Sequence, residues 1–307
     1  MAFRNILISN DVKITTKNEQ LVISSEEDNS IPLEDINCLL IESTHSIIST
    51  YTFQKFSQYG IAVYLCDDKH NPKSIILPFN THTRHYKMVK QQLDLSKPQK
   101  KRLWQQIIKM KIHNQALCYE LMGGDSSYLY LLEKRVTSGD TTNVEATAAV
   151  FFFKALYGND FKRFNDNFIN SCLNYGYAII RGIVARSIVC HGLEPSFGLF
   201  HKNELNSFNL ADDFLEPLRP FVDYFINKKL LIEYTDDFYA MNDGKLLPSH
   251  KKTIFSMLTY CIKSNNQDHI ISNAIERMII SYLSVLYGVN TELMLPEICQ
   301  LRQYEYK

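Results

Sequence analysis

The sequence has no excess of charge of either sign, because 33 Lys and Arg residues balance 33 Asp and Glu residues among 307. A global basic field that would attract nucleic acid to the whole chain is therefore absent. Long apolar runs are lacking as well. The most apolar segment, residues 148–153, is ended by Lys154, and the N-terminus turns polar after a short apolar stretch. We therefore expect neither a signal peptide nor a membrane span.

Paired cysteines are also missing. The seven cysteines are an odd number, lie far apart and include no C-x-x-C pair. This pattern argues against a disulfide framework and against a structural zinc site. We expect reduced thiols and a cytoplasmic protein.

Charge is unevenly distributed along the chain. Residues 84–111 contain nine basic residues and one acidic residue, a net charge of +8, whereas residues 1–70 contain five basic and ten acidic residues, a net charge of −5. Such a separation predicts one side of the molecule that suits phosphates. The alternative for the basic run is a solvated helix face without a partner.

The first 80 residues show the two-residue alternation of strands, rich in Ile, Val and Thr. The segments concerned are residues 3–9, 12–16, 20–25, 36–43, 61–66 and 73–79. The polar turn at 17–20 predicts a hairpin, and residues 50–60 predict a short helix. We infer an N-terminal β domain over residues 1–80.

From residue 84 onward the periodicity is helical. Helices are predicted at 100–122, 126–136, 143–158, 168–190, 211–230, 251–263 and 269–288. The predicted fold class is α+β, with a small N-terminal β-rich domain followed by a larger all-α domain over residues 81–307. At 307 residues the chain is long enough for both.

Residues 208–225 form an apolar helical run whose first turns carry three acids, Asp212, Asp213 and Glu216. A buried charge without a partner costs several kcal/mol or neutralises itself, so we expect positive groups beside them. The spacing puts either aspartate on the same helical face as Glu216. The alternative is that the acids only favour the positive end of the helix dipole.

Two further residues stand in unusual settings. His201 ends a loop punctuated by Gly and Pro at 192–201, and Glu145 is followed by small residues in an apolar helix. His201 alone is typical of a hydrogen-bonding residue, and Glu145 alone of an acid in a first helical turn. The combination of carboxylates and one imidazole suits Mg²⁺ or Mn²⁺ better than Zn²⁺, and such an ion handles phosphates.

Four motifs occur in register: E-A-T-A-A at Glu145, N-Y-G-Y at 174–177, G-L-x-P-x-x-G-x-x-H ending at His201, and D-F-L-E-P-L-R-P at 213–220. With the opening R-N-I-L-I-S-N and its hairpin, the sequence resembles the CRISPR-associated integrase, the catalytic subunit of the spacer-acquisition complex, and in particular its type II members. The resemblance covers essentially the whole chain. It implies an N-terminal β domain joined to a larger helical domain.

The resemblance also implies site residues. Glu145, His201 and Glu216 match the family's catalytic metal ligands, and Asp213 matches an acid that supports the site or binds the metal. Some relatives have aspartate where Glu216 stands. The implied cofactor is Mg²⁺ or Mn²⁺.

The implied activity is that of a metal-dependent DNA endonuclease and integrase. The 3′-hydroxyl of a short foreign DNA fragment attacks a phosphodiester at the edge of the CRISPR repeat, once on each strand, so the fragment becomes a new spacer. The sequence has no G-x-x-x-x-G-K-[ST] nucleotide-binding loop. Its absence is consistent with this activity, because transesterification needs no nucleotide. Implied partners are double-stranded DNA, a second copy of the chain bound through the β domain, and a smaller acquisition protein that bridges two dimers.

We expect basic residues near the site to bind DNA phosphates. The candidates are Arg84, Lys100, Lys101, Arg102 and Lys109. Trp104 is expected in the core, and Arg219 is expected to pair with an acid or a phosphate. Two other functions stay open: a metal-dependent nuclease for branched DNA, in which water attacks at the same residues, and a DNA-binding scaffold whose acids only cap helices.

Overall fold

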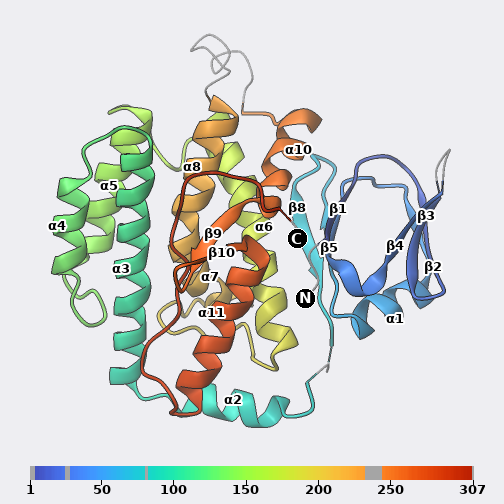
Figure 1. The fold of residues 1–307 in the computed structure, drawn as a ribbon, viewed down its shortest axis with the longest axis horizontal. Helices are drawn as coiled ribbons and strands as arrows, with labels where there is room; N and C mark the ends of the chain where they lie inside the picture. Colours follow the sequence, from blue (N-terminus) through green and yellow to red (C-terminus); the bar gives the residue numbers. More distant parts are fainter. Residues whose placement is uncertain (1–3, 25–27, 80–81, 232–243, 306–307) are drawn as a thin grey trace.

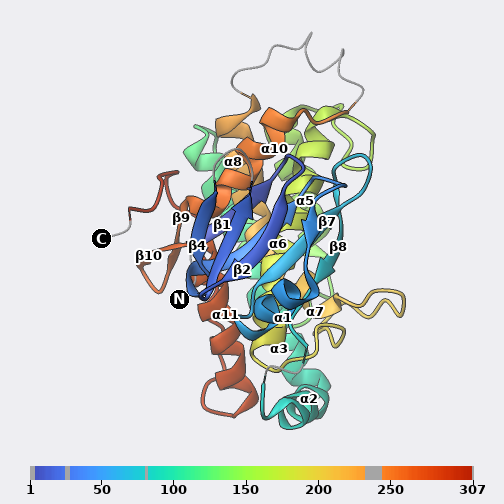
Figure 2. The same ribbon diagram turned by 90° about the vertical axis from the view of Figure 1, so that its right-hand side faces the viewer.

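The computed structural model describes residues 4–24, 28–79, 82–231 and 244–305. Its N-terminal strands lie beside a larger helical part, with α6 (Phe168–Cys190) close to the junction (Figure 1). Viewed from the side, the strands lie in front of the helices (Figure 2).

Two four-stranded sheets form the N-terminal part. The first has the order β1 (Arg4–Ile8), β5 (Ile36–Ile41), β7 (Ala62–Cys66), β8 (Pro72–Ile76), and only its last pair is antiparallel. The second has the order β4 (Asn29–Pro32), β3 (Gln20–Ser24), β2 (Lys13–Lys17), β6 (Ile47–Ile48). Helix α1 (Thr50–Gln58) connects β6 to β7, and Leu33–Asp35 form a 3-10 turn.

The central strands of the first sheet, β5 and β7, are covered on both faces, which explains their apolar character. All six residues of β5 are buried. Cys38, Leu40 and Tyr64 belong to the core of the helical part, whereas Leu39 and Val63 belong to the core of the N-terminal part. Successive side chains of a strand point to opposite faces, so this one sheet joins the two cores.

Close packing fixes the first sheet against α6. The Tyr64 hydroxyl donates a hydrogen bond to the carbonyl of Ile179 at 2.8 Å, and Arg186 Nε donates to the carbonyl of Gly60 at 2.6 Å. Gly182 makes room for the Tyr64 ring, since a Cβ there would lie 2.2 Å from a ring carbon. The first sheet therefore serves as the base on which α6 is held.

The helical part surrounds α6. Helices α3 (Lys97–Leu121), α4 (Ser127–Arg135) and α5 (Val144–Tyr157) form one side, as Figure 1 shows. Helices α7 (Asn209–Leu215), α8 (Arg219–Lys229), α10 (Pro248–Ser256) and α11 (Ile271–Leu286) contact α6 directly. Helix α2 (His85–Asp94) precedes α3, and 3-10 turns lie at Glu216–Leu218 (η2) and Met257–Thr259 (η4).

The predicted α+β class is confirmed, with strands in the N-terminal part and helices in the remainder. All six predicted strands and the hairpin at 17–20 are present, and β4 and β6 add two short strands. The predicted domain boundary at residues 80 and 81 lies outside the described residues.

Two predicted helices differ from the structure. The helix expected at 251–263 ends at Ser256, and a hairpin of β9 (Cys261–Ser264) and β10 (Gln267–Ile270) follows, so the helical part is not entirely α. Asn265 and Asn266, both with positive φ, form the turn of this hairpin. The helix expected at 211–230 is interrupted at Glu216 by η2.

All seven cysteines are free, as expected for a chain without a disulfide framework. Among the described residues, no helix combines the length and the apolar character that a bilayer span requires.

Candidate active site

Two of the predicted site residues meet on a single ammonium group. Lys111 of α3 donates hydrogen bonds to Glu145 Oε1 and, at 2.5 Å, to Glu216 Oε2. Lys111 and Glu216 are buried, and Glu145 is half-buried. Two carboxylates from different elements thus converge on one cation.

The start of α5 fixes the position of Glu145. Asp140 accepts hydrogen bonds from the backbone N–H groups of Val144 and Glu145, both at 3.0 Å. These N–H groups belong to the first turn of the helix, where the chain offers no helical acceptor. Capping by Asp140 therefore places Glu145 at the end of α5 that faces Lys111.

Pro217 determines the position of Glu216. A proline lacks the backbone N–H that a continuous α-helix would use, and here α7 gives way to the 3-10 turn η2 at Glu216. Side chains three residues apart eclipse each other in such a turn, which brings Arg219 Nε to 2.8 Å from Glu216 Oε1.

Asn114 holds this turn against α3. Its side-chain amide is fully buried and donates to the carbonyls of Pro217 at 2.7 Å and Pro296 at 2.9 Å, while its oxygen accepts from the N–H of Ile298. Asn114 lies three residues after Lys111, on the same face of the helix. The α3 face that carries the ammonium therefore also binds the turn that carries its carboxylate partner.

Electrostatics keep the cluster ionised. Burial opposes the charge of Glu216, but the Arg219 and Lys111 cations outweigh burial and lower its pKa to about 2. For Lys111, burial favours the neutral amine, yet the carboxylates of Glu216 and Glu145 outweigh it and raise the pKa of the ammonium. Two negative and two positive charges balance in this cluster.

A second arrangement centres on the predicted ligand His201. Its Nδ1 lies 2.7 Å from Asp213 Oδ1, and this hydrogen bond raises the pKa of the imidazole. The fully buried Asp213 also accepts from the backbone N–H groups of Leu199, Phe200 and His201. Asp213 therefore holds the loop and orients the ring, with Nε2 turned away from it. Direct metal binding by Asp213 stays a prediction.

The close approach of this loop requires a glycine at position 198. A Cβ at Gly198 would lie 2.3 Å from the carbonyl oxygen of His201 and 2.9 Å from Asp213 Oδ2. Trp104, buried as predicted, stacks on Phe200 with ring centroids 4.3 Å apart and meets the His201 ring edge-on. The only tryptophan in the sequence thus lies beside this histidine.

Asp212, Asp213 and Glu216 have separate basic partners, which confirms the expectation that positive groups lie beside them. Arg181 binds Asp212 at 2.6 Å, His201 binds Asp213, and Lys111 and Arg219 bind Glu216. The predicted sharing of one site by an aspartate and Glu216 is not seen, because the acids point to different partners.

A cavity of about 410 Å³ adjoins the carboxylate pair, with Lys111, Glu216 and Arg219 in its wall. Arg219 and Arg163 both lie over the Tyr177 ring, with Cζ 4.7 and 5.2 Å from its centroid. The Tyr177 hydroxyl donates to the buried Asp223 at 2.8 Å. Arg163 also donates to the amide oxygens of Asn170 and Asn174, and Phe164, 98% exposed, stands at the rim.

A smaller cavity of about 230 Å³ lies beside the stacked Trp104 and Phe200. Four lysines line it: Lys97, Lys100, Lys101 and Lys202. Burial, with the ammonium of Lys202 nearby, lowers the pKa of Lys100. Of the predicted DNA-binding residues, Lys100 and Lys101 therefore lie together near His201. Arg102 is exposed and Lys109 half-exposed on α3, and Arg84 is exposed before α2.

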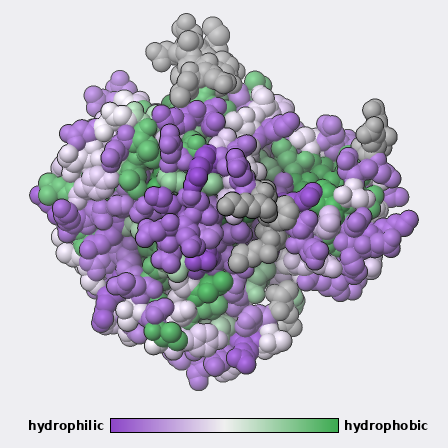
Figure 3. Space-filling model, viewed as in Figure 1, coloured by the Kyte–Doolittle hydropathy of each residue, from purple (hydrophilic) through white to green (hydrophobic). Residues whose placement is uncertain are grey.

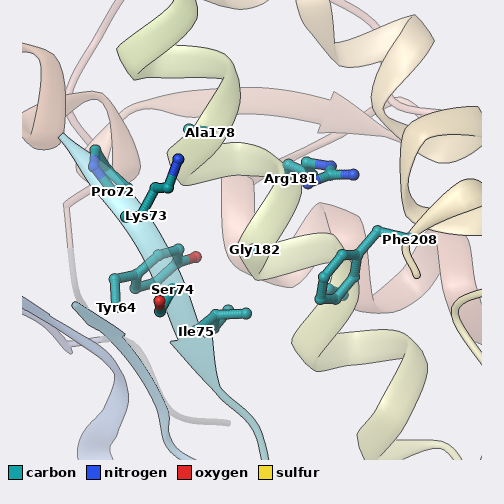
Figure 4. Close-up of a pocket in the computed structure, with 10 residues that line it drawn as sticks. Tyr64, Pro72, Lys73, Ser74, Ile75, Ala178, Arg181, Gly182 and Phe208 are labelled. Atoms are coloured by element: carbon teal, nitrogen blue, oxygen red, sulfur yellow. The ribbon is translucent and has the colours of Figure 1, made fainter. Parts of the chain in front are cut away.

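A third cavity, of about 220 Å³, lies between the two parts of the chain rather than at the acids. Figure 4 shows Lys73 and Ser74 of β8 opposite Arg181 and Gly182 of α6, with the ring of Phe208 nearby. It is small, and Arg181 at its edge is already bound to Asp212. We assign no chemistry to it.

The carboxylate pair fits a divalent cation. Its donors are the hard oxygen atoms that Mg²⁺ and Mn²⁺ prefer, and an ammonium already lies where both converge. His201 is not part of this pair: within the described ranges, no three His, Cys, Asp or Glu side chains form a group with metal-binding geometry. The ligand set Glu145, His201 and Glu216 stays a prediction.

Sequence reasoning missed the role of Lys111, which it counted with the basic run. The signal was present, because Lys111 lies inside the helix predicted at 100–122, four residues after the apolar Ile107 and so on the same face. Asp140 and Lys202 were also missed. Arg219 was expected to pair with an acid or a phosphate, and it pairs with Glu216.

Comparisons with known proteins agree with this architecture. The family model described as CRISPR associated protein Cas1 matches residues 6–156 and 158–258. The CRISPR-associated endonuclease Cas1 of Neisseria meningitidis serogroup C (strain 8013) is 37% identical over 315 aligned residues that cover 100% of both chains.

Two solved structures share the fold. A casposase bound to integration product superimposes with a TM-score of 0.76 at 17% identity, covering 94% of this chain and 92% of that one. A chain of a Cas6-RT-Cas1–Cas2 complex superimposes with a TM-score of 0.69 at 17% identity, covering 95% of this chain and 36% of that one. Since the family model spans most of the sequence and a full-length relative exceeds 30% identity, this chain is a member of the Cas1 family of CRISPR-associated proteins.

Proposed function

We propose that this protein is a metal-dependent DNA integrase and endonuclease of CRISPR adaptation, which joins the 3′-hydroxyl of a short DNA fragment to a phosphodiester at the edge of the repeat. The observation that carries the proposal is the convergence of Glu145 and Glu216 on one cation position. Family membership, with relatives named as an endonuclease and as a casposase bound to integration product, supports the reaction class.

In this proposal Glu145 and Glu216 would hold Mg²⁺ or Mn²⁺, and His201 would serve as a third ligand. A bound ion of this kind makes a hydroxyl more acidic and neutralises charge on a phosphodiester under attack. Asp213 fixes the imidazole through Nδ1, the arrangement in which a carboxylate orients a metal-binding histidine. Arg219 holds the second oxygen of Glu216 and keeps that carboxylate in place.

The reaction exchanges one phosphodiester for another. The bond from the attacking 3′-oxygen to phosphorus forms as the bond from phosphorus to the leaving 3′-oxygen breaks, and the proton of the attacking hydroxyl is released while the leaving oxygen gains one. No external energy source is needed. Hydrolysis differs only in the nucleophile, so the same residues also support nuclease activity.

Two cationic surfaces flank the carboxylates and suit DNA strands. On the His201 side, the lysine-lined cavity provides four ammonium groups for phosphates. On the Glu216 side, three side chains suit an unpaired nucleotide. Arg163 would bind its phosphate, the Asn174 amide would bind the edge of its base, and the exposed Phe164 ring would stack on the face of the base. We keep Arg84, Arg102 and Lys109 as further candidates for contact with the duplex.

The proposed assembly is a homodimer formed through the N-terminal strands, with two dimers bridged by a smaller acquisition protein. The likeness to a chain of a Cas6-RT-Cas1–Cas2 complex supports a Cas2-type partner. Hydrophobic side chains gather over the N-terminal strands on an otherwise largely hydrophilic face (Figure 3), which supports the dimer contact.

A strand-transfer assay tests the function. A labelled duplex with free 3′-hydroxyls is incubated with a supercoiled plasmid carrying the repeat, the smaller partner and Mg²⁺, Mn²⁺ or chelator. We expect the label to join the plasmid at the repeat edge, with loss of joining in chelator and in Glu145→Ala. The exposed Lys154→Ala on the same helix is the matched control, and it should join normally.

The other two functions predict different outcomes. A nuclease for branched DNA would cut without transferring label. A scaffold would give neither product with the wild type, and Glu145→Ala would leave every activity intact. In both enzymes Glu145→Ala would abolish turnover and leave DNA binding unchanged.

A further inference from the structure

Lys111 belongs to the basic segment 84–111, in which we expect DNA-binding residues. Only 7% of Lys111 is exposed, however, and its ammonium binds two proposed metal ligands, Glu145 and Glu216. We propose that Lys111 is the resident cation of the metal-free site and that a divalent ion binds by displacing its ammonium. The proposal rests on the proposed function for the identity of the ligands.

Geometry makes the two cations mutually exclusive. The ammonium is within hydrogen-bond distance of the oxygens of Glu145 and Glu216 at the place where the carboxylates converge. A metal ion held by both carboxylates would lie about 2.0–2.2 Å from those oxygens. Nζ cannot stay at its present position beside such an ion.

Charge balance leads to the same conclusion. Glu145 and Glu216 carry two negative charges, and Lys111 and Arg219 already offset them. Two more positive charges on a buried cluster would leave an uncompensated excess, which is costly in a low-dielectric interior. Departure of one resident cation reduces this excess from two charges to one.

Lys111 is the cation free to move. Arg219 lies over the Tyr177 ring and binds the other oxygen of Glu216, contacts that an ion between the carboxylates would leave in place. Both contacts of Lys111 are with the oxygens that the ion would take. Lysine has a flexible four-carbon stem and a compact charge, whereas arginine has a rigid planar fork.

The structure also offers a destination for the ammonium. Lys111 borders the cavity of about 410 Å³, and the buried carboxyl of Asp223 lines the same cavity. Asp223 accepts a hydrogen bond from Tyr177 through Oδ1. We assign Asp223 as the group that receives Lys111 after displacement, which makes both of them positioning residues.

One consequence is a fold that forms without metal, because Lys111 replaces the ion. A second is a reduced metal affinity, because binding must break the Lys111 ion pairs. Lys111 thus sets how much Mg²⁺ or Mn²⁺ the protein needs.

The test is a calorimetric titration of Mn²⁺ into the chelator-treated full chain without DNA, for wild type, Lys111→Met and the exposed control Lys134→Met. We expect Lys111→Met to bind Mn²⁺ about tenfold or more tightly, because its carboxylates have no internal competitor. Its melting temperature should be lower without Mn²⁺ and should rise more on addition of Mn²⁺ than that of wild type. Equal or weaker Mn²⁺ binding by Lys111→Met would overturn the proposal.

A second variant decides the question if Lys111→Met does not fold. Asp223→Asn keeps the shape of the side chain and the Tyr177 contact but removes the receiving charge. At pH 8, above the pKa of about 7 to which burial raises Asp223, this variant should bind Mn²⁺ several-fold more weakly than the wild type. An unchanged affinity would overturn the assignment of Asp223.

The double variant separates displacement from a general electrostatic effect. In the Lys111→Met background, Asp223→Asn should change the affinity little, because no ammonium needs a new partner. An equal loss in both backgrounds would show that Asp223 acts only through its charge. Since the titration contains no DNA, failure of the strand-transfer assay would leave this result intact, and the reverse also holds.

Discussion

Replacing Glu216 with Gln should change how the stability of this protein depends on pH. Glu216 is buried between Lys111 and Arg219, whose charges hold its pKa at about 2, against an ordinary value of 4.5. Each pKa unit corresponds to about 1.4 kcal/mol. The ionised carboxylate therefore contributes about 3 kcal/mol to the free energy of unfolding at neutral pH.

The sign of this pH dependence follows from the lowered pKa of Glu216 in the folded protein. The contribution is fully present above pH 4.5 and is lost as pH falls toward 2, with about 2 kcal/mol lost between pH 7 and pH 3. At pH 7, Glu216→Gln leaves buried cations without a charge partner and should lower the free energy of unfolding by about 3–5 kcal/mol. The gap between wild type and variant should narrow by about 2 kcal/mol at pH 3.

The free energy of unfolding of wild type and Glu216→Gln is measured by urea unfolding at pH 7, 5, 4 and 3 in chelator. Unfolding is followed by circular dichroism and by the fluorescence of Trp104. Other titrating groups cancel in the difference between wild type and variant. The exposed Glu204→Gln is the control, and its difference from wild type should stay small at every pH. A Glu216→Gln gap that is independent of pH would refute the proposed ion pairs.

Three further predictions test the surrounding structure. Gly182→Ala places a Cβ 2.2 Å from a Tyr64 ring carbon and should lower the free energy of unfolding by about 1–3 kcal/mol in urea unfolding, whereas no change would contradict the close contact of α6 with the first sheet. Asn114→Ala leaves the buried carbonyl of Pro217 unpaired and should cost about 1–3 kcal/mol and slow strand transfer, and an unaffected rate would argue against its role in holding η2. Burial raises the pKa of Asp223 to about 7 from 3.8, so wild-type stability should fall as pH rises between these values, by up to about 1.4 kcal/mol per unit. The stability of Asp223→Asn should not fall in this way as pH rises. Parallel pH profiles of stability for wild type and Asp223→Asn would contradict the raised pKa of Asp223.

The sequence predicted the elements that follow simple periodicity. The hairpin of β2 and β3 and the uninterrupted helix α6 are where two-residue and helical patterns are strongest. The hairpin at Asn265 and Asn266 was missed, although two adjacent asparagines between alternating residues favour a tight turn. The apolar run that precedes this turn is compatible with either helix or strand.

The candidate site was predicted in part for similar reasons. Because a cluster of acids in an apolar helix requires positive partners, the basic partners of Asp212, Asp213 and Glu216 could be predicted. Which basic residue binds which acid could not be predicted, because Pro217 changes the helix geometry and turns Glu216 toward α3. Lys111 was assigned to a surface by its charge, whereas tertiary contacts with two carboxylates bury it.

The most direct test of the central claim compares two donor duplexes that differ only at the 3′ end, one with a hydroxyl and one with 3′-deoxy termini, in the strand-transfer assay with Mn²⁺. The account predicts that only the hydroxyl donor becomes covalently joined to the plasmid, and that Glu216→Gln and Glu145→Ala abolish joining while still binding DNA. Plasmid cleavage at equal rates with both donors, without covalent joining, would contradict it and identify water as the nucleophile.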